Sequence, residues 1–419
     1  MNNWKYDKLS NLSDEIGDGL HGTPEYTDNS DIFFINGNNL KNGTIEITKN
    51  TKRVTSEELS KNFVTLNNNT LLLSINGTLG SMAFYNNEKV MLGKSCAYIN
   101  FKSNINKFYY YYFQLDEIKK YFYNEATGST IKNLSLKSLQ DFQVPVPSKN
   151  DWQKIAAVLS SLDSKIELNN RINAELEAMA KTIYDYWFVQ FDFPDENGKP
   201  YKSSGGKMFY NKQLKRELPV GWEVGSFGDY AKVKSGFAFK STWWSDKGIP
   251  VLKIKDINED YSLNQNDFSF VDEDKKIIAE KFLSKPGDVV IAMTGATIGK
   301  FALIPKTEKP ILVNQRVGLY DLGNHPFEKV SFLINSMKQE FFRSLVVSIA
   351  GGAAQPNISG EQLDNFPLVL PNSNLISKYN DKISWCYKTI ANNIMLNQQL
   401  IQLRDWLLPM LMNGQVKVK

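Results

Sequence analysis

Apolar side chains between Asp151 and Phe188 recur in alternating steps of four and three residues, and neither Gly nor Pro interrupts the stretch. The apolar positions are Ile155, Leu159, Leu162, Ile166, Leu176, Ala180, Ile183 and Trp187. This spacing is typical of the seam of a coiled coil, and it predicts a helix roughly 57 Å long. Such a helix cannot bury its seam alone, so it requires a partner helix.

The partner is predicted between Tyr379 and Leu411, where the pattern repeats. Its seam residues are Tyr379, Ile383, Cys386, Ile390, Leu400, Leu407 and Leu411, with Arg404 in the slot of Ala180. In both stretches two Asn residues occupy the middle of the seam, Asn169 with Asn173 and Asn393 with Asn397. This coincidence indicates an internal duplication. An antiparallel pairing in which Asn169 meets Asn397 and Asn173 meets Asn393 fills every layer, so we predict that these residues set the register of the helix pair.

The segments before the two helices also resemble each other. LLLSINGTLGSMAFY (Leu71–Tyr85) corresponds to VVIAMTGATIGKFALI (Val289–Ile304), and each reads as strand, tight turn and strand. TGSTIKNLSLKSLQDFQVPVP (127–147) corresponds to GGAAQPNISGEQLDNFPLVLP (351–371). The predicted fold class is therefore α+β, with two α/β globules separated by two long antiparallel coiled-coil helices and related by pseudo-twofold symmetry.

The expected domains follow from these repeats. They are a first globule at 1–150, a central long helix at 151–190, a linker at 191–218, a second globule at 219–372 and a C-terminal long helix at 373–415. The segment 191–218 is rich in Gly, Lys, Ser and Pro and shows neither a helical nor a strand period, so we expect it to be a linker or an extended arm.

Composition narrows the class of protein. Hydrophobic residues make up 42% and charged residues 22% of the chain, as in ordinary globular proteins. No apolar run reaches the roughly 18 residues of a membrane span, and the N-terminus lacks an apolar signal region, so we expect a cytoplasmic protein. With two Cys and two His, a disulfide framework is excluded and a Cys/His zinc site is disfavoured. The net charge of +4 permits nucleic-acid binding without requiring it.

Three short motifs suggest chemistry but are better explained as loops. GDGLHG (17–22) lacks the helix that a dinucleotide site needs, because Thr23-Pro24 follows it. GATIGK (295–300) is one residue short of a phosphate-binding loop and is followed by Phe301 instead of Ser or Thr. PDENGK (194–199) lies on the linker and not on paired core strands. We therefore predict no catalytic residue and no metal site.

Recognition chemistry is better represented. Lys side chains suit phosphate contacts, and Arg, Asn and Gln suit bidentate contacts with guanine and adenine edges, although any single one of these residues is also compatible with a solvated surface. The candidate DNA-binding residues are Lys52, Arg53, Thr78, Lys94, Lys132, Lys234, Lys253, Lys255, Thr297, Lys300, Gln315, Arg316, Gln355 and Asn357.

Several segments together identify a family. They are WFVQFDFPDENGKPYKSSGGKM (187–208), ELPVGWEV (217–224), GIPVLKIKDI (248–257), the turn TGATIG, and the blocks VPVP and LVLP before each helix. With these segments and its duplication, nearly the whole chain resembles the specificity subunit of a Type I restriction–modification enzyme. The resemblance implies that each globule is a target recognition domain reading one half of a split, asymmetric double-stranded DNA target, and that the helices set the unread gap.

The resemblance also implies partners. Two modification subunits would bind S-adenosylmethionine and methylate adenine, and restriction subunits would use ATP and Mg, so no cofactor is expected on this chain. The alternative is a non-catalytic coiled-coil interaction scaffold with two ligand-binding globules and no nucleic acid. A further alternative, a fused methyltransferase or nuclease, lacks the motifs. Steep salt dependence of DNA binding would exclude the scaffold, and methyl transfer by the chain alone would support the enzyme.

Overall fold

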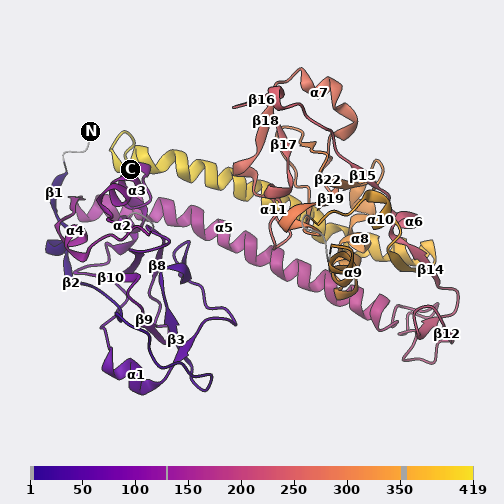
Figure 1. The fold of residues 1–419 in the computed structure, drawn as a ribbon, viewed down its shortest axis with the longest axis horizontal. Coiled ribbons are helices and arrows are strands. Elements are labelled where there is room, and N and C mark those ends of the chain that lie inside the picture. Colours follow the sequence, from indigo (N-terminus) through magenta and orange to yellow (C-terminus); the bar gives the residue numbers. More distant parts are fainter. Residues whose placement is uncertain (1–3, 129–130, 351–355, 419) are drawn as a thin grey trace. The chain divides into compact units, whose positions relative to one another are not determined.

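The computed structural model describes residues 4–128, 131–350 and 356–418 (Figure 1). The chain folds into two compact units, one formed by Met1–Lys165 with Leu400–Lys419 and the other by Ile166–Gln399. Each unit contains one globule and part of the two long helices, α5 (Lys149–Tyr184) and α11 (Ser373–Met412). A π-helical turn, Asp185–Val189, continues α5.

The globule of the first unit is built on a four-stranded antiparallel sheet in the order β2-β10-β7-β8. These strands are β2 (Ser13–Asp18), β10 (Cys96–Phe101), β7 (Thr70–Ser74) and β8 (Met82–Phe84). Every residue of β7 and β10 is buried, because the sheet is covered on both faces. On one face Leu71 and Ile99 pack with aromatic side chains of α2 (Asn106–Tyr112), and on the other Leu72 packs with a second, smaller sheet.

The smaller sheet has the order β6-β3-β9, with β3 (Ile32–Ile35) parallel to β9 (Val90–Leu92) and antiparallel to β6 (Arg53–Val54). The strands β1 (Lys5–Lys8) and β11 (Gln143–Val146) form a separate antiparallel pair, and β4 (Leu40–Lys41) pairs with β5 (Thr44–Ile45). The remaining helices are α1 (Ser56–Lys61), α3 (Asp116–Glu125) and α4 (Leu136–Asp141).

The globule of the second unit repeats this topology. Its main sheet has the order β15-β22-β19-β20, formed by β15 (Val233–Ser235), β22 (Val317–Tyr320), β19 (Val289–Ala292) and β20 (Phe301–Leu303). The smaller sheet, β16-β18-β17-β21, again joins one parallel pair, β17 (Ile249–Leu252) with β21 (Leu312–Val313), to the antiparallel strands β18 (Ser269–Val271) and β16 (Trp244–Ser245). The duplication predicted from the sequence is therefore present in the order of the main sheet and in the parallel pair of the smaller sheet.

The other elements of this unit are β14 (Glu223–Ser226) paired with β23 (Pro367–Leu370), and the helices α6 (Phe227–Tyr230), α7 (Lys275–Ile278), α8 (Val330–Met337), α9 (Glu340–Ala350) and α10 (Gly360–Asp364). The two predicted hairpins are confirmed, since Leu72 lies opposite Ala83 and Val290 lies opposite Ala302. Both turns contain glycines with φ between 74° and 87°, a conformation that side chains with a Cβ disfavour.

One loop prediction was wrong, and the linker has more structure than its sequence pattern indicates. Gly17 and Asp18, expected in a glycine-rich loop, extend β2, and a Cβ on Gly17 would lie 2.6 Å from the hydroxyl of Tyr98 on the next strand. The linker contains a hairpin, β12 (Met208–Asn211) with β13 (Arg216–Pro219). The hairpin is held by tertiary packing that no local period reveals, because Leu218 is buried in the main core of the unit and Phe209 packs against that core.

The long helices make the antiparallel side-chain contacts expected from the seam. In the second unit the Nδ2 of Asn169 donates to Oδ1 of Asn397, and the Nδ2 of Asn393 donates to Oδ1 of Asn173, both at 2.8 Å. Asn170, outside the predicted seam, accepts a hydrogen bond from Nδ2 of Asn397 at 2.8 Å. The role of these residues in setting the register stays a prediction.

In the first unit, Arg404 occupies a seam position that is otherwise apolar, and the carboxylate of Asp163 on the other long helix pairs with it. The Nη1 of Arg404 donates to Oδ1 of Asp163 at 2.8 Å, and the other oxygen of Asp163 accepts from the hydroxyl of Tyr111 at 2.6 Å. The carboxylate therefore joins both long helices to α2. The Nε of Arg404 also donates to Oδ1 of Asp405 at 3.0 Å, so charge-assisted hydrogen bonds to two carboxylates hold the guanidinium at this seam position.

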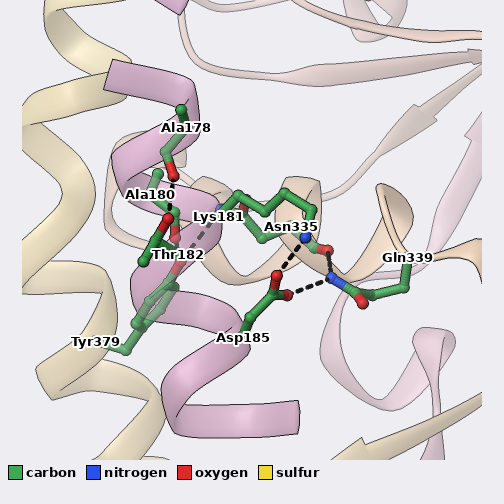
Figure 2. Close-up of polar contacts among 8 residues, drawn as sticks. All are labelled: Ala178, Ala180, Lys181, Thr182, Asp185, Asn335, Gln339 and Tyr379. Carbon is green, nitrogen blue, oxygen red and sulfur yellow. Dashed lines mark hydrogen bonds and ion pairs between the residues drawn. The ribbon is translucent and has the colours of Figure 1, made fainter. Parts of the chain in front are cut away.

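In the second unit the end of α5 is fixed by polar contacts with α11 and with Gln339, which follows α8 (Figure 2). The hydroxyl of Tyr379 donates to the carbonyl of Ala180 at 3.1 Å. Gln339 donates from Nε2 to Oδ1 of Asp185 and to the carbonyl of Asn335, each at 3.2 Å, and Asp185 also pairs with Lys181. These contacts attach the globule directly to the end of α5.

Candidate nucleic-acid interface

Each globule presents three turns that follow strands of its two sheets. In the first unit they are residues 36–39, 76–81 and 93–95, and in the second they are 253–256, 294–299 and 314–316. We call each set of three turns a loop edge. In the first unit hydrogen bonds bring the turns together, since the N–H of Gly37 donates to Oγ of Ser95 at 2.9 Å and the N–H of Ile75, directly after β7, donates to the carbonyl of Ser95.

The two loop edges share one backbone hydrogen-bond pattern. In the first unit the N–H of Ile75 donates to Ser95 O at 3.0 Å, and the N–H of Lys94 donates to Leu20 O at 3.0 Å. In the second unit the N–H of Met293 donates to Arg316 O at 3.0 Å, and the N–H of Gln315 donates to Phe237 O at 2.9 Å. Lys94 therefore corresponds to Gln315, and Ser95 corresponds to Arg316.

Half of the predicted DNA-binding residues lie on a loop edge. They are Thr78 and Lys94 in the first unit and Lys253, Lys255, Thr297, Gln315 and Arg316 in the second, and Lys300 directly follows the turn 294–299. Asn357 lies beside the second loop edge through a β-bridge with Thr294, and Lys132 directly precedes Asn133, which bridges to Asn76. Gln355 lies outside the described residues.

Three candidates lie elsewhere. Lys52 and Arg53 belong to the edge of the smaller sheet, with Lys52 over the ring of Tyr26 and Arg53 over that of Phe33. Lys234 lies on β15, and its Nζ is 2.5 Å from Oδ2 of Asp321. The structure therefore does not bring these three residues onto the turns.

Several of the cations already have partners within the chain. Lys300 pairs with Glu259 at 3.2 Å, Lys255 donates to Asp267 O at 2.7 Å, and the Nζ of Lys253 is 3.4 Å from the ring centre of Trp244. Lys132 donates to Ala126 O at 3.2 Å. In contrast, Lys94, Gln315 and Arg316 are exposed, and within the described residues no side-chain hydrogen bond or ion pair engages them.

Sequence reasoning missed Asp256, which is fully buried beneath the turn 253–256. Burial raises the pKa of its carboxyl to about 6. Its Oδ2 accepts from the N–H of Lys253 at 2.7 Å, whereas Oδ1 has no hydrogen-bond partner among the described residues. In the first unit Asn39 fills the same place, and its Oδ1 accepts from the N–H of Asn36 at 2.9 Å. In both globules a residue with a side-chain oxygen lies three positions after the first residue of the turn, and this shared spacing could have identified Asp256 from the sequence.

Replacing Asp256 with Asn should stabilise the protein at neutral and alkaline pH. The turn needs an acceptor and not a charge, as Asn39 shows. Because the pKa is raised from about 3.8 to about 6, the folded chain binds an extra proton in this window, so stability falls as the pH rises through it and stays lower above it. The difference corresponds to at most about 3 kcal/mol, and we expect a gain of about 1–2 kcal/mol at pH 8 for Asp256→Asn.

Urea unfolding of both proteins between pH 4 and pH 8 measures this effect. The exposed Asp246 of the same globule supplies the control, because Asp246→Asn should leave the free energy of unfolding nearly unchanged. An Asp256→Asn variant no more stable than the wild type at pH 8 would contradict the prediction.

No cluster of three or more His, Cys, Asp or Glu that could hold a metal ion occurs among the described residues. Within the same residues, no helix is both long and apolar enough to span a membrane. The chemistry that the loop edges offer is hydrogen bonding and positive charge on exposed turns.

Comparison with known proteins follows the same division into halves. The model of the family described as Type I restriction modification DNA specificity domain matches residues 1–178 and 219–403. A Type I restriction enzyme specificity subunit from Methanocaldococcus jannaschii is 24% identical over 426 residues, covering 99% of this chain and 94% of that protein. Another, from Haemophilus influenzae, is 22% identical over 70% of this chain and 73% of its own length.

A solved structure shares the fold. The S subunit of a Type I restriction-modification system from M. genitalium matches with a TM-score of 0.55 at 18% identity, covering 98% of this chain and 96% of that chain. Together with the two matched segments, this likeness confirms the predicted fold class of duplicated globules and paired long helices.

Proposed function

We infer the function from one premise: the chain belongs to the family of Type I restriction modification DNA specificity domains, which match both of its halves. It is a DNA specificity subunit of a Type I restriction–modification system, and it is a recognition subunit without catalytic activity of its own. What remains to be proposed is how its parts share the work.

We propose that each globule reads one half of a split, asymmetric target in double-stranded DNA through its loop edge. The observation that carries this proposal is the shared backbone of the two loop edges, which holds different side chains at equivalent positions. A shared backbone conformation supports the same docking geometry on DNA for both globules. Different side chains on that backbone support recognition of different bases in the two half-sites. The recognition domains are residues 1–150 and 219–372, joined through the helices at 151–190 and 373–415 and the linker at 191–218.

The long helices are proposed to set the gap between the half-sites and to dock two modification subunits. Exposed apolar residues recur on both helical segments at the same steps of eleven, seven and three residues. They are Leu168, Met179, Tyr186 and Val189 on the first and Trp385, Leu396, Leu403 and Trp406 on the second. Steps of seven and eleven keep residues on one helix face, and exposed apolar stripes of this kind suit a partner surface.

The partner subunits supply the chemistry in this proposal. The modification subunits bind S-adenosylmethionine and methylate adenine, and restriction subunits that join the complex use ATP and Mg. The complex acts in the cytoplasm, where it meets chromosomal DNA. This chain recognises the target sequence and holds the partner subunits together.

The function is tested by co-expressing the chain with the modification subunit of its own system and mapping methylated adenines on genomic DNA. We expect one split motif, in which exchange of residues 219–372 for those of another specificity subunit changes one half and leaves the other intact. Normal assembly without any methylation, or a change in both halves after one exchange, would contradict the proposal. Absence of salt-dependent binding to duplex DNA would favour a scaffold without nucleic acid.

A further inference from the structure

We propose that Arg316 reads a guanine in the half-site of the second globule, and that its counterpart Ser95 reads no base and instead closes the first loop edge. This inference rests on the proposed function and assigns unequal roles to two structurally equivalent positions. It concerns the junction where the turns 93–95 and 36–39, or 314–316 and 253–256, meet.

In the first globule the junction is closed by neutral hydrogen bonds. The hydroxyl of Ser95 donates to Oδ1 of Asn36 and accepts from the N–H of Gly37, both at 2.9 Å. The packing leaves no room for larger side chains, because a Cβ on Gly93 would lie 2.3 Å from Asn36 Oδ1, and one on Gly37 would lie 2.1 Å from Ser74 Oγ. The hydroxyl of Ser95 therefore both donates and accepts a hydrogen bond within the protein.

In the second globule this closure is chemically impossible. Arg316 stands at the place of Ser95, and Lys253 stands at the place of Asn36. Neither side chain has an acceptor, so they cannot reproduce the Ser–Asn bond. The ammonium group of Lys253 turns to the ring of Trp244 instead, 3.4 Å from its centre. The guanidinium of Arg316 is left exposed.

The backbone beneath Arg316 is nevertheless fixed. Its carbonyl accepts from the N–H of Met293 at 3.0 Å, and its N–H donates to Oδ1 of Asn314 at 3.2 Å. The neighbouring N–H of Gln315 donates to Phe237 O at 2.9 Å. An exposed guanidinium on a fixed turn is suited to bidentate contact with O6 and N7 of guanine in the major groove.

A base contact is favoured over a phosphate contact by the comparison between globules. Phosphate contacts do not depend on sequence, so two globules with one fold and one mode of docking are expected to keep them at equivalent positions. A cation is present at position 316 and a fully engaged neutral residue at position 95. The difference marks the position as one that distinguishes the two half-sites.

The test measures binding of the complex with its modification subunits to duplexes in which each base pair of the motif is varied in turn. For Arg316→Ala we expect discrimination at one guanine of the second half-site to fall about tenfold or more, with the first half-site read normally and the salt dependence unchanged. Normal reading of the first half-site also shows that the variant is folded. Arg316→Lys should restore little of the discrimination, because an ammonium lacks the planar fork.

The matched control is Lys247→Ala, which removes an exposed cation at the end of β17 opposite the turn 253–256 and should leave the base preferences of both half-sites unchanged. Uniform weakening for every sequence after Arg316→Ala, with the salt slope reduced by about one, would identify a phosphate contact and overturn the inference. Unchanged discrimination would also overturn it. If the wild-type complex reads no split motif at all, the proposed function itself fails, so the two failures are distinguishable.

Discussion

Deleting one heptad from each long helix, Ser164–Asn170 and Leu396–Gln402, should shorten the gap between the half-sites by about one to three base pairs and leave both half-sites unchanged. Seven residues span about 10.5 Å of helix, which is about three base pairs if the helix lies along the DNA and fewer if it is inclined. The deletions remove facing segments of an antiparallel pair, so the phase of the seam is kept. The Asn173–Asn393 layer remains to hold the register.

Mapping of methylated adenines measures the gap directly. Deletion from one helix alone is the control, since it shifts every following layer of one helix against the other and should abolish assembly. The deletions remove the exposed Leu168 and Leu396 but leave Trp385, Leu403 and Trp406 for partner binding. Altered half-sites with an unaltered gap would show that the helices do not set the length of the gap.

Replacing Leu403 and Trp406 together with Glu should abolish binding of a modification subunit and with it methylation of the target. Leu403 is 43% and Trp406 is 60% exposed, so both offer apolar surface that the chain itself does not cover. Buried aromatic anchors at interfaces contribute about 2 kcal/mol or more, and two new carboxylates in the same contact add a desolvation cost. We expect affinity for the modification subunit to fall at least about 30-fold.

The same variant separates docking from folding. Because both residues are exposed, the free energy of unfolding of the chain alone should change by no more than about 0.5 kcal/mol for each substitution. Gln402→Glu, at an adjacent exposed position, adds a charge without removing apolar surface and should leave partner binding intact. Full binding by the double variant would exclude this face as the docking surface.

The long helices and the duplication could be predicted from the sequence because their signals are local or repeated. A 4-3 spacing of apolar residues defines a helix seam without reference to any other segment. The two Asn pairs placed that seam in one antiparallel register, and Asn169 and Asn397 are indeed within hydrogen-bonding distance. The apolar strands β7 and β19 could be predicted for the same reason, since each is buried on both faces.

The chemistry of the loop edges could not be predicted in the same way, because it depends on partners distant in the chain. Lys234 and Lys300 were plausible DNA contacts by residue type, but Asp321 and Glu259 pair with them in the folded structure. The hairpin of the linker likewise depends on burial of Leu218 in the core and on packing of Phe209 against it.

The sequence by itself determined the helices, their register and the repeated order of strands, because the periodicity and the repeat follow from the order of the residues alone. Only the tertiary structure decided which polar groups remain available. It placed Ser95 against Asn36 and left Arg316, at the equivalent position, exposed to solvent. The physical reason is that a side chain's availability depends on what folding brings beside it, and hydrogen bonds between residues 59 apart leave no trace in local pattern.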